Sequence, residues 1–402
     1  MTMADGLHSL STDTAEIMAI EDQFQVATYA KLPVALVRGE GCYVWDATGK
    51  RYLDLYGGHC VALVGHCHPR LVSAITEQAS KLMFYSNVVY SDVRALAAQR
   101  LAALAPEGLG HVFFCNSGTE ANETALKMAR RHTQRRWVVS MSEGFHGRTL
   151  GSLGPTGPES FRDPSYPVPV EHRRVPFGDL GALQEAMGDD VAAVMVEPVL
   201  SMGGIRVADA EWYQGMRAAC DRVGALLIFD EVQTGFGRTG TNFFGEQVGV
   251  TPDVITAAKG VAGGFPAGVV FVADAVAAEI RPGDHGSTFG GGHLACAAMA
   301  AVAELIVELG LPAQAGARGE QLSQGLSALP GVKSVSGRGL LLGVNLDRPA
   351  KPVVAALRAQ GVLVGGSKLP NQLRLLPPLT LSAAEADQFV AAMAKVLIAN
   401  GA

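Results

Sequence analysis

The sequence predicts an α/β protein built on a mostly parallel sheet. Between residues 111 and 273, short and continuously apolar runs alternate with stretches of helical spacing. Such runs are typical of strands buried on both faces, and intervening helices connect parallel strands in sheets of this kind. The chain has 402 residues, of which 48% are hydrophobic, and this is enough apolar material for a large core.

The N-terminal part predicts an arm, a β-meander and a helix. Residues 1–20 are polar, which favours an arm or a short helix. Residues 34–56 alternate apolar and polar side chains around a turn at Asp46–Gly49, and we expect a short antiparallel meander there. Residues 70–83 have helical spacing.

The central part supplies the main sheet. Its expected strands are residues 111–115, 136–140, 191–197, 224–230, 253–257 and 268–273. Its expected helices include residues 119–133 and 210–224. Ligands of such sheets bind beyond the carboxyl ends of the strands, so the residues that follow each strand are the first candidates for a site.

The C-terminal part predicts a second, smaller α+β unit. A helix is followed by a strand at 338–346, a helix at 352–360, a short strand pair and a helix at 381–399. We therefore expect a division into an N-terminal segment that belongs to the small domain, a large domain and a C-terminal small domain, covering residues 1–60, 61–305 and 306–402.

Composition argues against nucleic acid and membrane partners. Lys and Arg number 32 and Asp and Glu 38, a net charge of −6, whereas a phosphate backbone requires a basic surface. The most apolar stretch, residues 294–312, contains Glu304 and Glu308. A charge at a bilayer centre costs about 2.5–3.5 kcal/mol, so we expect a buried amphipathic helix.

The cysteines and the N-terminus favour the cytoplasm. Six cysteines are scattered along the chain without a CxxC pair, which indicates free thiols. No basic segment followed by an apolar one opens the sequence, so we expect no secretory signal. His66 and His68 flank Cys67, but no further ligands stand at zinc spacing, and we expect no metal site.

Charged side chains follow two of the expected strands. Asp230 ends the run at 226–229, and Lys259 follows the run at 253–257 among small residues. Burial lowers the pKa of a lysine and makes its amine a nucleophile. The two residues are 259 − 230 = 29 positions apart, about one strand–helix–strand unit, so neighbouring strand ends can hold them. Alone, each is explained as well by a helix cap or a lysine that extends to the surface.

Residues 113–130 join a strand to a helix and predict an anion site. Ser117 and Glu120 fit a capping box, and Gly118 lets a bound group approach the first amides of the helix. Residues 285–299 suit a second phosphate contact, and residues 144–152 offer an arginine for a carboxylate. A lysine, an aspartate and a phosphate site on one sheet together predict pyridoxal phosphate, whose pyridine nitrogen the aspartate would keep protonated.

The chain resembles the class III (subgroup II) pyridoxal-phosphate aminotransferases of fold type I from about Tyr29 to its end. The stretches that carry the resemblance are NSGTEANETALKMAR (116–130), GFHGRT (144–149), VEPV (196–199), FDEVQTGFGRTG (229–240), AAKG (257–260), STFGG (287–291) and LRLLPPL (373–379). The resemblance implies a large domain with a mostly parallel seven-stranded sheet and a smaller α+β domain, and it is strongest for the acetylornithine/ornithine branch.

The resemblance also implies roles around the cofactor. Lys259 would bond pyridoxal phosphate and then carry the proton that moves during the reaction. Asp230 would pair with the pyridinium nitrogen, Gln233 with the phenolic oxygen, and Phe145 would stack on the ring. The other expected cofactor contacts are Ser117, Gly118, Thr119, Val232 and, across a homodimer interface to the other subunit's phosphate, Thr288.

Further residues are implied to bind substrate. Arg148 would bind the α-carboxylate of an acylated ornithine or the side-chain carboxylate of glutamate. Arg374 would bind the α-carboxylate of glutamate or 2-oxoglutarate, and Glu197 would pair with Arg374 while the ω-amino substrate is bound. Ser287 would lie near the substrate, and Tyr29 would face it.

Two departures from the family pattern concern the substrate pocket. Residues 197–204 read EPVLSMGG where the family often reads EPIQGEGG, so that Leu200, Ser201 and Met202 replace Gln, Gly and Glu. This leaves the acyl group of the substrate open. His59 occupies a position that is Ile in many acetylornithine enzymes and Tyr in ornithine enzymes. It would either contact a polar substrate group or form part of the wall.

The expected activity is transfer of the ω-amino group of N-acetylornithine, or a related N-acylornithine, to 2-oxoglutarate in arginine biosynthesis. Ornithine, 4-aminobutyrate, N-succinyl-diaminopimelate and carrier-bound lysine are alternative donors within the class. Decarboxylation or an intramolecular amino shift is a second alternative, against which the two arginines argue. A non-catalytic homodimeric binding protein is a third, against which the complete set of cofactor residues argues.

Overall fold

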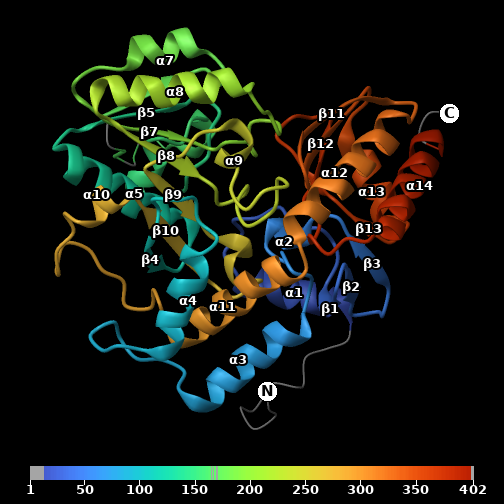
Figure 1. Cartoon of the computed structure of the whole chain (residues 1–402). Helices are drawn as coiled ribbons and strands as arrows, with labels where there is room; N and C mark the ends of the chain where they lie inside the picture. Colours follow the sequence, from blue (N-terminus) through green and yellow to red (C-terminus); the bar gives the residue numbers. More distant parts are fainter. Residues whose placement is uncertain (1–12, 164, 166, 169–170, 400–402) are drawn as a thin grey trace.

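A seven-stranded sheet forms the centre of the molecule, and six of its strands are parallel. The computed structural model describes residues 13–163, 165, 167–168 and 171–399 (Figure 1). The strand order is β4-β10-β9-β8-β7-β5-β6, and β10 alone runs antiparallel to its neighbours. The strands are β4 His111–Cys115, β5 Trp137–Met141, β6 His172–Val175, β7 Val191–Val196, β8 Leu226–Asp230, β9 Val254–Ala257 and β10 Gly268–Val272.

Helices cover both faces of this sheet, which confirms the predicted class. Successive residues of β8 belong to opposite cores: Ile228 packs with α5, whereas Phe229 packs with α8. This alternation follows from the period of two along a strand. The helices of this part are α3 Pro69–Lys81, α4 Asp92–Ala102, α5 Gly118–Thr133, α6 Leu150–Leu153, α7 Leu180–Ala186, α8 Ala210–Val223, α9 Gly245–Val248, α10 Asp274–Ala277 and α11 His293–Glu308.

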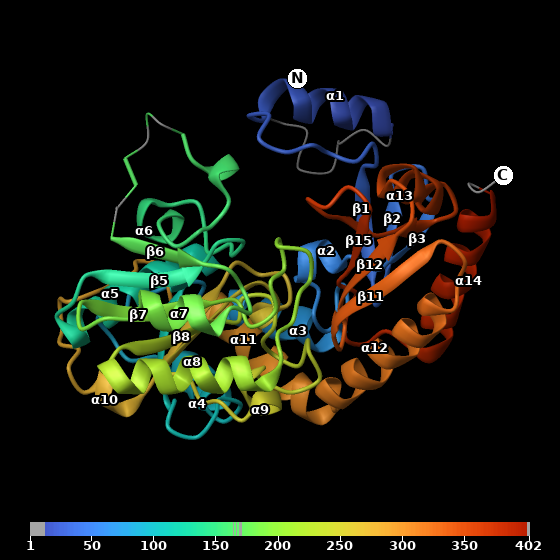
Figure 2. The ribbon, with the colours of Figure 1, turned by 90° about the horizontal axis from the view of Figure 1, so that it is seen from above.

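Two four-stranded sheets lie beside the central one, in the lobe that Figure 2 shows to the right. The first has the order β1-β2-β3-β13, in which β13 runs parallel to β3. The second has the order β11-β12-β15-β14. Their strands are β1 Leu36–Glu40, β2 Tyr43–Asp46, β3 Arg51–Asp54, β11 Val332–Arg338, β12 Leu341–Leu346, β13 Val362–Leu363, β14 Gly365–Gly366 and β15 Gln372–Leu375. The domain boundaries at residues 60 and 305 stay predictions.

The remaining helices lie mainly in the terminal parts of the chain. They are α1 Thr14–Phe24, α2 Gly57–Cys60, α12 Leu311–Ser327, α13 Ala350–Ala359, α14 Ala383–Ala399 and the 3-10 helices η1 Glu159–Phe161 and η2 Lys259–Ala262. The first residues of the expected N-terminal arm, 1–12, lie outside the described residues. The single strand expected at 338–346 is instead the second half of the hairpin β11–β12, because the chain turns at Gly339, where φ is +53°.

The apolar stretch at 294–312 is α11 with the turn that follows it. This helix is buried on nearly all sides rather than amphipathic, and ion pairs with Arg70 satisfy both Glu304 and Glu308. Within the described residues, no single helix has the length and apolar composition to cross a membrane, although α11 and α12, bent by 65°, pass that test as a pair.

The histidines and cysteines near residue 66 have structural partners. His66 Nε2 bonds to Asp54 Oδ2 at 2.8 Å, and His68 Nδ1 accepts a hydrogen bond of 3.3 Å from the amide of Arg70 at the start of α3. All six cysteines are free, and among them only Cys67 is exposed.

Candidate active site

A cavity of about 540 Å³ lies at the carboxyl ends of the central strands. Its wall combines the loops that follow β4, β5, β7, β8 and β9 with Tyr29 and Val61, which precede the central strands. Of the residues expected from the sequence, the cavity is lined by Tyr29, Ser117, Gly118, Thr119, Phe145, Arg148, Glu197, Asp230, Val232, Gln233 and Lys259. His59, Ser287, Thr288 and Arg374 do not line this cavity.

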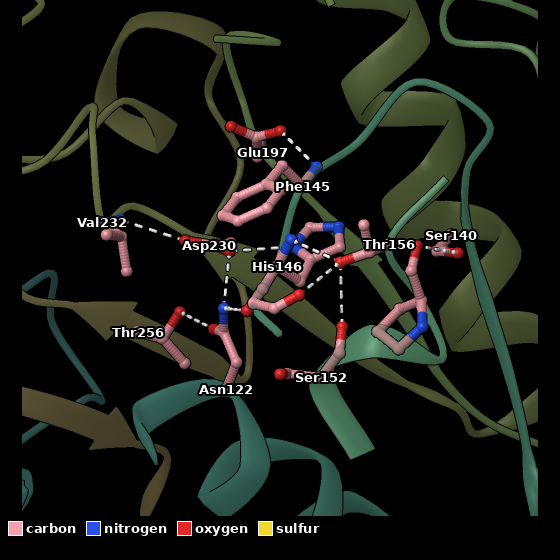
Figure 3. A network of polar contacts seen from close by, with 12 residues as sticks. Asn122, Ser140, Phe145, His146, Ser152, Thr156, Glu197, Asp230, Val232 and Thr256 are labelled. Atoms are coloured by element: carbon pink, nitrogen blue, oxygen red, sulfur yellow. Dashed lines mark hydrogen bonds and ion pairs between the residues drawn. The ribbon is translucent and has the colours of Figure 1, made fainter. Parts of the chain in front are cut away.

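A buried polar network fixes the orientation of Asp230 (Figure 3). Its Oδ2 accepts hydrogen bonds of 2.8 Å from both Asn122 Nδ2 and His146 Nδ1, and its Oδ1 accepts one of 3.1 Å from the amide of Val232. Asn122 is held in turn by the hydroxyl of Thr256 at 2.6 Å. Because His146 donates through Nδ1, its buried Nε2 is left without a partner among the described residues.

Lys259 follows β9, next to the strand that ends at Asp230, as the spacing of the two residues predicts. The pKa of its amine is lowered by burial, an effect that the neighbouring carboxylates of Asp230 and Glu197 oppose. A lower pKa leaves more of the amine unprotonated and nucleophilic. Its φ of +47° is uncommon for a residue with a side chain, and such backbone strain occurs often at functional sites.

Glu197 lies buried at the end of β7. Its Oε1 accepts a hydrogen bond of 2.8 Å from the amide of Phe145, and its Oε2 accepts one of 3.4 Å from the amide of Ser201. Burial raises the pKa of this carboxyl to about 7. No hydrogen bond or ion pair joins Glu197 to Arg374 in the described part of the chain, so the expected pairing of the two is not present in this structure.

The start of α5 is the candidate for the expected anion site. Ser117 Oγ accepts a hydrogen bond of 3.2 Å from the amide of Glu120, and the Glu120 carboxylate accepts one of 2.9 Å from the amide of Asn116. The capping box is therefore present, but its return bond reaches one residue further back than expected. A side chain at Gly118 would approach Val232 to 3.0 Å, so glycine keeps the approach to the helix start open.

The hydroxyl of Thr119 faces those of two neighbouring residues. It lies 2.6 Å from Ser152 Oγ and 2.9 Å from Thr149 Oγ1. Ser287 and Thr288 line a separate hollow with Thr119, and Ser287 Oγ accepts a hydrogen bond of 3.1 Å from Asn116 Nδ2. The role of Thr288 at the phosphate of another subunit stays a prediction.

Arg148 is exposed at the wall of the cavity and stacks on aromatic rings. Its guanidinium carbon lies 5.7 Å from the ring centre of Phe145 and 4.7 Å from that of Phe161. A planar guanidinium held in this way keeps its donors free for a carboxylate.

Arg374 lies on β15, and residues from several elements surround it. Its Nε donates to the carbonyl of Gly366 at 2.6 Å, its Nη1 lies 3.4 Å from Met202 Sδ, and its Nη2 donates to Tyr56 Oη at 3.4 Å. Tyr56 Oη also bonds to His59 Nδ1. Glu197, Asp230 and Lys259 thus form one polar group in the cavity. Tyr56, His59 and Arg374 form a second polar group, on the side of the small sheets.

Three members of the site were missed by the sequence analysis as residues with a role. Asn122 and His146 lie inside the motifs 116–130 and 144–149, but nothing in those letters shows that both side chains converge on Asp230. Tyr56 stands in a stretch that was interpreted only as the end of a meander. A tyrosine three residues before the unusual His59 was the available signal.

These residues fit the expected cofactor. A half-buried lysine, a fixed carboxylate and a helix start surround one cavity, and Gln233 Oε1 is buried there without a partner among the described residues. An unpaired polar atom buried in a wall indicates that a bound group completes its hydrogen bonds.

Comparison with known proteins gives the family. The model of the family described as Aminotransferase class-III matches residues 24–397. The acetylornithine aminotransferase of Methanopyrus kandleri is 43% identical over 94% of this chain and 98% of its own. The crystal structure of an ornithine aminotransferase from Toxoplasma gondii ME49 superposes with a TM-score of 0.92 at 29% identity, covering 98% of this chain and 96% of that one.

A further structure concerns the cofactor directly. An ornithine aminotransferase from Toxoplasma gondii with partial occupancy of pyridoxal phosphate at its active site has a TM-score of 0.91 and 30% identity, over 96% of this chain and 95% of that one. The chain belongs to the class-III aminotransferases, which use pyridoxal phosphate.

Proposed function

We propose that this chain is an N-acetylornithine aminotransferase, which passes the terminal amino group of N-acetylornithine to 2-oxoglutarate. The products are N-acetylglutamate semialdehyde and glutamate, and the reaction belongs to arginine biosynthesis in the cytoplasm. The observation that carries the proposal is the placement of Lys259 and Asp230 on neighbouring strand ends, in one cavity with Arg148. The acetylornithine substrate is supported by the similarity to full-length acetylornithine aminotransferases.

Each residue at the centre of the cavity has a defined task. When bound, pyridoxal phosphate supplies the electron sink that makes the proton on the reacting carbon labile. Lys259 moves that proton, because burial lowers the pKa of its amine and so makes the unprotonated, accepting form more available. Asp230, fixed by Asn122 and His146, holds a proton on the ring nitrogen.

The two arginines suit the two substrates. Arg148 binds one carboxylate at the cavity wall, and Arg374 binds a second on the side of the small sheets. Glutamate and 2-oxoglutarate carry two carboxylates, whereas N-acetylornithine carries one together with an ω-amine. Burial raises the pKa of Glu197 to about 7. Glu197 is the carboxyl group that balances Arg374 when N-acetylornithine is bound.

The proposal includes a homodimer. Seven of the nine residues in the segment 82–90 are exposed and apolar or aromatic, interrupted only by Ser86 and Asn87. The segment lies beside Ser287, and Phe289 extends its apolar surface through a ring contact with Phe84. Val88 is 84% exposed and Phe289 65% exposed. Contiguous apolar surface of this kind marks an interaction site in a folded protein, and a second copy would cover it next to Thr288.

The cofactor's own absorbance tests the proposed substrate. N-acetylornithine, added to the holoenzyme without a keto acid, should shift the near-visible absorption band to shorter wavelength, and 2-oxoglutarate should restore it. Lys259→Ala should abolish the conversion. A band that ornithine or 4-aminobutyrate shifts, and N-acetylornithine does not, would transfer the activity to that donor. A protein that takes up no pyridoxal phosphate would overturn the proposal altogether.

A further inference from the structure

The segment between β3 and the central part makes a left-handed turn at Gly57–Cys60. The φ angles there are +57°, +58°, +70° and +68°, and the last two belong to His59 and Cys60, which have side chains. Backbone of this kind persists only where its surroundings enforce it. Here Asp54 Oδ1 accepts hydrogen bonds of 2.9 and 3.0 Å from the amides of Tyr56 and Gly57. A side chain at Gly57 would collide with the carbonyl of Leu376, so only glycine fits there.

This turn brings Tyr56 and His59 together next to Arg374. Their rings lie at an interplanar angle of 85° with centres 5.2 Å apart, and Tyr56 Oη bonds to His59 Nδ1. Arg374 Nη2 lies 3.4 Å from the same Oη. One phenol oxygen therefore contacts a guanidinium on one side and an imidazole nitrogen on the other.

The chemistry of these three groups fixes the proton on His59. A guanidinium only donates, so Tyr56 Oη accepts from Arg374, and the phenol proton finds its partner when it is donated to His59 Nδ1. In this arrangement Nδ1 accepts, and the proton of the neutral imidazole is on Nε2. The ring is neutral near pH 7, because burial together with the charges of Lys259 and Arg374 lowers the pKa of His59 to about 3.

The free edge of this imidazole faces accessible space. His59 is half-buried, and its Nε2 has no hydrogen-bond partner among the described residues. This nitrogen is not fully buried, so a ligand can reach it. Lys259 and Arg374 are the two charges that act on the ring. His59 is therefore near both the reacting amine and the second arginine.

Arg374 has no acidic partner in the described part of the chain. Where the family often has a glutamate, this chain has Met202, and its sulfur lies 3.4 Å from Arg374 Nη1. A buried charge without a counter-charge is unfavourable. When the dicarboxylic partner is bound, the anion that balances Arg374 is then a carboxylate of that substrate.

We propose that Tyr56, His59 and Arg374 form one carboxylate-binding unit. In this unit His59 Nε2–H and the Arg374 guanidinium donate to the same carboxylate, and Tyr56 is a positioning residue that keeps the proton on Nε2. The ligand is the α-carboxylate of the dicarboxylic partner, glutamate or 2-oxoglutarate, so this inference rests on the proposed function.

Glutarate is the probe for this unit, because it has the two carboxylates of 2-oxoglutarate but no group that reacts. Its affinity for the holoenzyme is measured by calorimetry. Since a hydrogen bond to a charged group is lost, His59→Phe should weaken glutarate binding about tenfold and Tyr56→Phe about fivefold. His59→Gln keeps a hydrogen-bond donor, so its glutarate affinity should stay within about twofold of the parent's, a smaller change than the loss of one hydrogen bond causes. Tyr43→Phe, which removes an exposed hydroxyl bonded to Gln388, is the matched control and should change nothing.

A second measurement reads the proton directly and does not depend on activity. In protein labelled with ¹⁵N-histidine, the signals lost in His59→Gln identify His59. They should show a protonated Nε2 and an accepting Nδ1, and Tyr56→Phe should shift them towards a mixture of tautomers. A proton on Nδ1 in the parent protein, or unchanged glutarate affinity in a folded Tyr56→Phe variant, would overturn the unit.

The two proposals fail in different ways. If glutarate binding depends on Tyr56 and His59 but N-acetylornithine is not converted, the carboxylate-binding unit stands and the proposed donor falls. If N-acetylornithine is converted and glutarate binding is indifferent to both residues, the proposed function stands and the unit falls.

Discussion

At Asp230, donors from three separate segments converge on one carboxylate. Asn122 comes from α5, His146 from the loop after β5, and the amide of Val232 from the loop after β8. The sequence predicted Asp230 because a strand ends there, and it predicted Lys259 for the same reason. It could not predict the convergence, because that depends on how α5 packs against β8 and β9.

Asn122→Ala tests the network around Asp230. The substitution removes the donor to Asp230 Oδ2 and leaves the buried Thr256 hydroxyl without its acceptor. A buried polar group left unpaired costs about 1–3 kcal/mol, so the free energy of unfolding should fall by that amount. We expect kcat to fall about tenfold or more, the equivalent of one such hydrogen bond, because the Asp230 carboxylate is less well oriented. Chemical denaturation and steady-state kinetics measure the two effects, and an unchanged kcat would contradict the role of Asn122.

Glu231→Gln tests a second buried acid, which follows Asp230. Burial raises the pKa of Glu231 to about 8 in the folded protein, above its value in the unfolded chain. An acid with a raised pKa is most favourable to folding when protonated, so its contribution is complete below about pH 4.5 and is lost as the pH rises to about 8. Relative to the parent, Glu231→Gln should therefore become more stable between pH 5 and 8. Urea unfolding at several pH values measures this difference, and a difference independent of pH would show that the raised pKa is wrong.

At the scale of elements, the strands and helices of the central sheet were predictable, because continuous apolar runs have few other interpretations. β6 was missed, since three of its four residues, His172–Val175, are polar and it pairs with one neighbour only, at the sheet edge. The hairpin β11–β12 was taken for one strand, because β11 is mostly half-buried or exposed and shows no apolar run. The left-handed turn at Gly57–Cys60 has no sequence pattern of its own beyond its two glycines.

Ser117→Ala tests the helix start that we propose as the anion site. Loss of a capping hydroxyl costs about 1 kcal/mol, and the start of α5 should also bind the cofactor phosphate less well because its first turn is less ordered. Asp209 caps α8 in the same way, through a bond of 3.2 Å from the amide of Trp212, but lies outside the cavity. Asp209→Ala should therefore cost similar stability and leave cofactor affinity unchanged. Equal cofactor affinities in both variants, measured by fluorescence titration of pyridoxal phosphate, would remove the anion site from α5.

At the scale of the whole molecule, the two lobes meet where a fully buried arginine joins them. The backbone carbonyl of Arg238 accepts the amide of Leu340 at 2.9 Å, and its Nη1 donates to the carbonyls of Leu340 and Pro377. Such a contact between segments far apart in the sequence is invisible before the fold is known. The same holds for Arg374, whose partners Tyr56, Met202 and Gly366 come from three different parts of the chain.

Val88→Asp tests the homodimer at this scale. A carboxylate in the middle of the exposed apolar run would be desolvated by a second copy, so the variant should be monomeric and should lose most of its activity if Thr288 acts across the interface. Ile398→Asp replaces another apolar residue, 71% exposed near the end of α14, and should leave assembly unchanged. Light scattering after size exclusion gives the mass of each. A parent protein that is monomeric at micromolar concentration would exclude the dimer.

The antiparallel strand β10 lies between the two strands that lead into the candidate site. These are β4, which leads to the start of α5, and β9, which leads to Lys259. Neighbouring strands are about 4.8 Å apart, so β4 and β9 are held about 10 Å from each other inside the sheet by main-chain hydrogen bonds. Beyond the sheet their loops converge, because a side chain at Gly118 would lie 3.0 Å from Val232 and 3.6 Å from Ala258, which precedes Lys259. The distance between the start of α5 and Lys259 is thus set by the course of the loop backbone and not by the spacing of the strands.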